Sequence, residues 1–153
     1  MRFFTLICAL MVWATSSQAQ ELHDDAFRLS QIDGVRVSLL DYAKGACWTN
    51  LKEVRDYAEE KLRIKGVKIN DEIGMDPGKD YVLEISVAAG RLYQDGSGPC
   101  IGVAGSSLYT VAFIEGKRHI AEIAWNASLK AEKQNFNRHT IKITAELIGK
   151  LQR

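Results

Sequence analysis

The sequence lacks the charge imbalance and the charged runs that are typical of polyanion-binding proteins. It has 20 lysines and arginines against 19 aspartates and glutamates, and loss of Arg2 with the leader discussed below makes the two numbers equal. No run of like charge exceeds two residues. A neutral chain with interspersed charges provides no long-range field for nucleic acid or for an anionic membrane surface, so we expect neither as a partner.

The sequence also lacks the spacings of common catalytic and metal sites. It contains no H-E-x-x-H, G-x-S-x-G, G-x-G-x-x-G or G-x-x-x-x-G-K-S/T pattern. Gly96-Ser97-Gly98 precedes no helical pattern that could place an amino terminus at a phosphate. His119 and His139 have no ligand-type neighbours at metal-binding spacing. We therefore predict no catalytic residue, no cofactor and no metal, although a Ser/His/Asp set assembled by the fold stays open.

The first nineteen residues have the features of a secretory signal. Arg2 is followed by an apolar run over residues 3–14, and Ser17-Gln18-Ala19 has the small-x-small form of a cleavage site. The run is shorter than the ~20 residues of a membrane-spanning helix. We predict a signal peptide at 1–19, a single domain at 20–153 without a transmembrane segment, and a periplasmic or secreted location.

Three cysteines are present, and the leader contains Cys8. Cys47 and Cys100 remain, and two cysteines in an exported chain most simply form one disulfide. Their spacing is not the C-x-x-C of redox sites. Closing so long a loop would stabilise the fold by about 4 kcal/mol in the chain-entropy model.

Two segments show the periodicity of amphipathic helices. The first begins near Asn50 and ends before Gly66, and its apolar stripe consists of Leu51, Val54, Ala58 and Leu62. The second runs from Asn137 to the end of the chain, with an apolar stripe of Ile141, Ile143, Leu147, Ile148 and Leu151. Each helix needs an apolar surface on which to pack.

Alternating segments predict the strands that supply this surface. Asp33-Gly34 favours a hairpin between residues 26–32 and 35–40, and further strands are expected at 67–69, 81–89, 108–114 and 118–129. In the last of these, Ile123, Trp125, Ala127 and Leu129 share one face. The pattern predicts an α+β fold, a mostly antiparallel sheet with two amphipathic helices packed on one face, in which every apolar stripe is buried.

A binding rim is predicted beside the disulfide. Trp48 follows Cys47, and Tyr93 and Ser97 lie in the segment that leads to Cys100. A rigid, crosslinked rim with aromatic side chains is a candidate contact surface. The alternative is that Trp48 and Tyr93 simply cover the disulfide.

The residues Gly34-Val35-Arg36-Val37, 62–69 and 81–85, followed by a closing amphipathic helix, resemble those of small exported bacterial proteins of unknown function. Their layout is similar to the amino-terminal α/β domain of the Tol translocation protein. The resemblance implies action by protein contact, without catalytic residues. We therefore expect a non-enzymatic interaction or envelope-assembly module whose partner is another envelope or secreted protein. The alternative is a small secreted hydrolase, or a small-ligand carrier that uses the space between sheet and helices.

Overall fold

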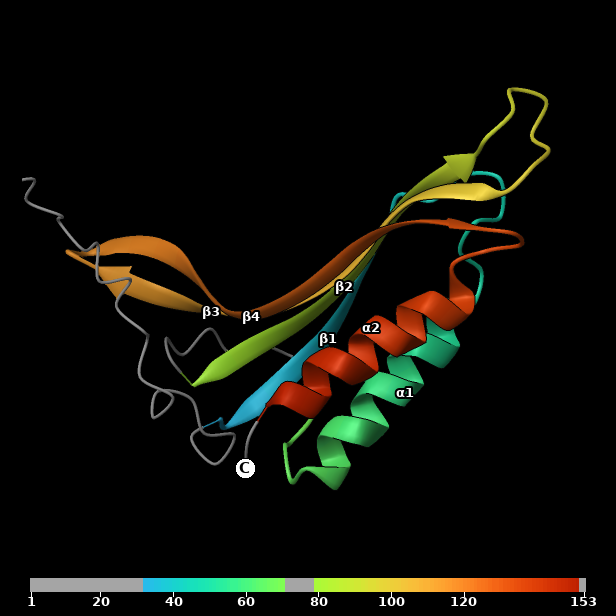
Figure 1. The fold of residues 1–153 in the computed structure, drawn as a ribbon. Helices are drawn as coiled ribbons and strands as arrows, with labels where there is room; N and C mark the ends of the chain where they lie inside the picture. Colours follow the sequence, from blue (N-terminus) through green and yellow to red (C-terminus); the bar gives the residue numbers. More distant parts are fainter. Residues whose placement is uncertain (1–31, 71–78, 152–153) are drawn as a thin grey trace, which may run out of the picture.

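The alternating and helical segments form four strands and two helices. The computed structural model describes residues 32–70 and 79–151. In chain order the elements are β1 (Gly34–Asp41), α1 (Leu51–Ile64), β2 (Asp80–Arg91), β3 (Cys100–Ile114), β4 (Lys117–Glu132) and α2 (Asn137–Lys150). The strands form one sheet in the order β1-β2-β3-β4, and both helices lie on the same side of it (Figure 1). The predicted α+β fold is confirmed.

The direction of each strand follows from the connection that precedes it. Strands β1 and β2 are parallel, and α1 lies in the crossover between them, as parallel neighbours require. The β2–β3 and β3–β4 pairs are antiparallel, because a short connection returns the chain beside the strand that it has just left. The sheet is therefore mostly antiparallel with one parallel edge.

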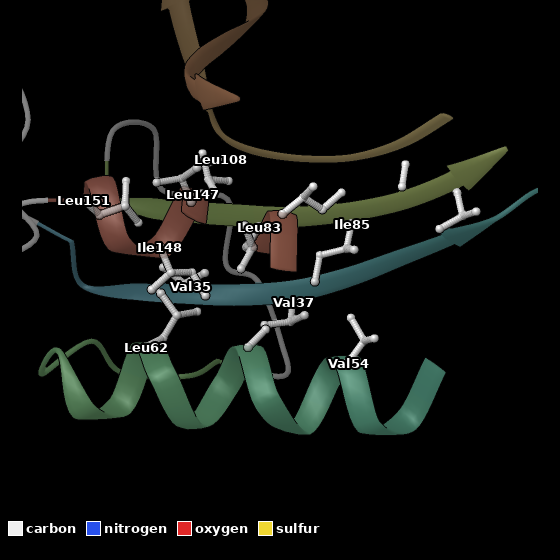
Figure 2. Close-up of a cluster of buried hydrophobic side chains, with 14 of the residues drawn as sticks. Val35, Val37, Val54, Leu62, Leu83, Ile85, Leu108, Leu147, Ile148 and Leu151 are labelled. Atoms are coloured by element: carbon white, nitrogen blue, oxygen red, sulfur yellow. The ribbon is translucent and has the colours of Figure 1, made fainter. Parts of the chain in front are cut away.

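The core lies between the helices and the inner face of the sheet. Helix α1 buries Val54, Ala58 and Leu62, and α2 buries Ile143, Leu147 and Ile148. Figure 2 shows Val54 and Leu62 directed from α1 toward the strands. Strands β1 to β3 meet them with fully buried side chains, namely Val35, Leu83, Ile85, Val87 and Leu108. Helix periodicity and strand alternation thus place all the packed apolar side chains in one layer.

The predicted hairpin at Asp33-Gly34 is wrong as a turn. A type I′ turn needs positive φ at both central residues, but Gly34 is the first residue of β1 and is not among the glycines with positive φ. The Asp33 amide instead donates to the Lys79 carbonyl at 3.1 Å. Most of the predicted first arm lies outside the described residues. The expected strand at 67–69 is reduced to one parallel bridge between Ile69 and Val35.

The prediction that every apolar stripe is buried is wrong for β4. Trp125 and Leu129 are 65% and 74% exposed. Asn126 and Ser128 lie on the side that faces α2, where Asn126 Nδ2 donates to the Ile143 carbonyl at 3.3 Å. Polar contacts to α2 therefore place the apolar side of β4 on the opposite face of the sheet.

The predicted leader at 1–19 lies outside the described residues and stays a prediction. Neither described helix has the length and hydropathy of a membrane span.

The predicted disulfide is present and buried. Cys47 and Cys100 are joined across a sequence separation of 53, with Cα atoms 5.6 Å apart, and both are fully buried. The Phe136 amide donates to the Cys47 carbonyl at 2.7 Å, and the Thr49 amide donates to Asn137 Oδ1 at 3.0 Å. The disulfide and these hydrogen bonds connect the first turns of both helices to the start of β3.

We expect the Cys47→Ser, Cys100→Ser double variant to lose about 4 kcal/mol of unfolding free energy, because the unfolded chain regains the entropy of a long open loop. Urea unfolding followed by circular dichroism measures this loss. A reductant strong enough to open the buried bond should lower the unfolding free energy of the native protein to that of the variant. It should leave the unfolding free energy of the variant unchanged. Equal stability of the oxidised protein and the variant would show that the bond contributes nothing.

Candidate functional site on the uncovered face of the sheet

The face of the sheet opposite the helices carries a group of exposed apolar side chains. Ile101 and Val103 project from β3, and Trp125 and Leu129 project from β4; we call these four residues the outer patch. Val103 and Leu129 are directly paired across the two strands, so their side chains lie side by side on one face. Strand alternation therefore gathers on one surface apolar groups that neither helix covers.

Small residues form the floor between the larger side chains of the outer patch. The paired residues Gly105 and Ala127 lie between the Val103–Leu129 pair and Trp125 along the strands. On its other side, Gly105 pairs with Ser86 of β2. A Cβ placed on Gly105 would lie 3.4 Å from Ala127 Cβ and 3.5 Å from Ser86 Oγ, which is ordinary contact distance. The backbone therefore lies close to the surface between these side chains, and an open apolar surface suits another protein better than an enclosed small molecule.

A polar contact borders the outer patch along the strands. The Tyr109 hydroxyl on β3 donates to Glu84 Oε2 on β2 at 3.3 Å. Burial and the neighbouring carboxylate raise the pKa of Tyr109 above its ordinary value, so the phenol stays protonated and remains a donor. Apolar side chains bordered by polar groups are typical of protein interfaces.

Beyond this border, β3 and β4 continue as a two-stranded arm over residues 111–120. The last β2–β3 pair joins Tyr81 and Thr110, whereas the β3–β4 pairing continues to Ile114 and Lys117. Figure 1 shows this end of the two orange strands extending away from the helices. Phe113, Ile114 and Ile120 are exposed on the arm. Because a two-stranded ribbon alone is only marginally stable in water, a partner that covered the arm would also stabilise it.

A β-bulge sets which side chains of the arm lie on the outer face. Leu108 pairs with Ala124, but the next residue, Tyr109, pairs with Glu122, so Ile123 has no partner of its own. Beyond the bulge, Ile120 pairs with Val111. The extra residue changes the alternation of β4 and places Ile120 on the same face as Trp125.

The predicted binding rim is divided between buried and exposed residues. Trp48 is only 4% exposed, and its Nε1 donates to Asn50 Oδ1 at 3.1 Å. It therefore presents little surface, in line with the alternative that it covers the disulfide.

The other two rim residues lie in the turn between β2 and β3. Tyr93 is 57% exposed, and its ring packs over Gly98, where an added Cβ would lie 2.7 Å from Tyr93 Cδ2. The Ser97 amide donates to Asp95 Oδ1 at 2.8 Å, which shapes the turn. A binding role for Trp48, Tyr93 and Ser97 stays a prediction.

A serine and a histidine are in contact between β4 and α2. The Ser128 hydroxyl is hydrogen-bonded to His139 Nε2, and His139 is buried. Burial lowers the pKa of His139 below its ordinary value, and the nearby Lys130 and Lys142 lower it further. No described carboxylate hydrogen-bonds to this imidazole, so the orienting third member of a triad is missing from the part of the chain that the structure describes. The contact instead fastens α2 to β4.

The described ranges hold no group of three or more histidine, cysteine, aspartate or glutamate side chains arranged to bind a metal ion.

Comparison with known proteins yields distant structural likeness. No family model matches the chain, and no curated protein matches it. A PelC dodecamer from Paraburkholderia phytofirmans is 20% identical, with a TM-score of 0.44, over 82% of this chain and 93% of that one. The rare lipoprotein B from Shewanella oneidensis is also 20% identical, with a TM-score of 0.24, over 61% of this chain and 68% of that one. Likenesses this distant assign no function.

We expect Trp125 to dominate the collisional quenching of tryptophan fluorescence by acrylamide. Trp48 and Trp125 are the tryptophans of residues 20–153, and Trp125 is exposed whereas Trp48 is buried. Trp125→Phe should therefore remove most of the quenchable emission of a protein that consists of residues 20–153. Quenching of that variant as strong as in the native protein would show that the outer patch is covered.

We expect the stability of the protein to fall more between pH 7 and pH 5 than that of a His139→Gln variant. The lowered pKa means that the unfolded state binds a proton before the folded state does, so this contribution is present above about pH 6.5 and declines as the pH falls toward the folded pKa. Urea midpoints across this range measure it. His119→Gln, at an exposed site, is the control and should keep the native dependence of stability on pH. The same dependence in His139→Gln as in the native protein would refute the role given to His139.

Proposed function

We propose that this protein is a non-enzymatic interaction module of the periplasm or the extracellular space, and that the outer patch and the arm bind a partner protein. A buried intramolecular disulfide supports an oxidising compartment, in agreement with the predicted leader. The partner is another envelope or secreted protein, as the resemblance to the amino-terminal domain of the Tol translocation protein also suggests.

The outer patch is the observation that carries this proposal. Contiguous exposed apolar surface is unfavourable in water and marks interaction sites in monomeric proteins. Trp125, the largest side chain of the patch, is 65% exposed, and tryptophan is among the side chains that contribute most to protein–protein affinity. The floor of small residues at Gly105 and Ala127 permits close approach of a second surface.

The two alternative functions find less support in the same residues. A ligand carrier would need space between the sheet and the helices, where Leu62, Leu83 and Leu147 are fully buried core side chains (Figure 2). A hydrolase built on Ser128 and His139 lacks a described carboxylate to orient the histidine. Binding through the outer patch needs neither a cavity nor a triad.

Photo-crosslinking in producing cells tests the proposal. Benzoylphenylalanine at position 125 should give a discrete product with another protein, whereas the same residue at position 42 should not. Tyr42 is a matched control because it is an aromatic residue of similar exposure, 62% against 65%, outside the outer patch. Trp125→Lys should reduce the crosslinking yield from position 129 at least fivefold, because a charge would be buried at the contact. Equal products from positions 125 and 42, or none from either, would contradict the proposal.

A further inference from the structure

The free edge of β1 faces a groove bordered by α1. Strand β1 is at the end of the sheet and pairs with β2 on one side. On the other side, the described residues provide one bridge, in which the Val35 amide donates to the Lys68 carbonyl at 2.9 Å and the Val35 carbonyl accepts from the Asn70 amide at 3.1 Å. Beyond Val35 lies a groove of about 450 Å³, lined by Arg36, Val37, Ser38, Leu39, Arg55 and Glu59.

The backbone groups of Val37 and Leu39 point into this groove. Successive residues of a strand direct their amide and carbonyl groups to opposite sides. Val35 bonds away from β2, whereas Tyr42 bonds toward it, with its amide donating to the Val87 carbonyl at 2.9 Å. Val37 and Leu39 are two and four residues after Val35, so their amide and carbonyl groups are directed to the same side as those of Val35, away from β2. In the described ranges no strand pairs with them there, which leaves an edge able to accept another strand.

The charges beside this edge favour an acidic ligand. Glu59 of α1 is ion-paired with Arg63 at 2.8 Å, which compensates its charge. Arg55, one turn earlier on the same helix, is in no ion pair with a described carboxylate. Arg36 adds a second guanidinium to the groove. The groove therefore has an excess of positive charge, and arginine can bind a carboxylate through two parallel hydrogen bonds.

We infer that the β1 edge and α1 together bind an extended peptide segment of a partner protein that carries an acidic side chain. The peptide adds a strand beside Val37 and Leu39 through main-chain hydrogen bonds, and its aspartate or glutamate contacts Arg55. This site is separate from the outer patch, so either of the two surfaces can fail its test without the other.

Selection and binding measurements test this inference. A library of eight-residue peptides displayed on phage and selected on the purified protein should enrich sequences with one acidic residue among β-formers. For the best synthetic peptide, Arg55→Gln should weaken binding at least threefold in fluorescence anisotropy. Arg138→Gln, an exposed arginine on the other helix, is the matched control and should leave binding unchanged.

Backbone recognition is tested on the peptide, so that the protein fold stays intact. N-methylation of those alternate peptide amides that face β1 should abolish binding. N-methylation of the other amides, which face away from β1, should leave binding intact. Nuclear magnetic resonance should show the largest amide shifts at Val37 and Leu39. Three results would overturn the inference: no enriched sequence, shifts concentrated at Val103 and Leu129, or self-association of the protein through β1 that excludes the peptide.

Discussion

The bond between Cys47 and Cys100 is the constraint on which the arrangement of the layers depends. It connects the entry of α1 to the start of β3, and the hydrogen bond from the Phe136 amide to the Cys47 carbonyl brings α2 to the same place. Both helices therefore begin at one end of the sheet and lie over the same face (Figure 1). With its covering layer fixed on one side, the sheet keeps the opposite face for other contacts.

The two open surfaces of the sheet differ in chemistry. The outer patch offers side chains, with Trp125 and Leu129 projecting over a floor of small residues, and its binding depends on apolar area and shape. The edge of β1 offers backbone groups of Val37 and Leu39 next to Arg55, so its binding depends on extended conformation and charge. One surface suits a folded partner, and the other suits a segment without structure of its own.

The sequence predicted those parts of the fold that local periodicity determines. The stripe of Val54, Ala58 and Leu62 predicted α1, and the alternation from Tyr81 predicted β2, because one face of each is buried in the core. For β4, alternation distinguishes two faces but does not say which is inside; contacts of Asn126 and Ser128 with α2 decide it. The predicted rim included Trp48 because it adjoins Cys47, yet adjacency in sequence says nothing about burial.

The bulge at Ile123 shifts the inward and outward alternation of side chains along β4 by one residue. Every residue of β4 before it, including Ile120, takes its inward or outward phase from that one extra position. If Ile123 instead paired with Tyr109 without a bulge, Ile120 would pair with Ala112 and be directed to the side of the helices, and Lys117 and His119 would turn outward. The orientation of the arm is thus set by the bulge, which the alternation of residue types along β4 does not reveal.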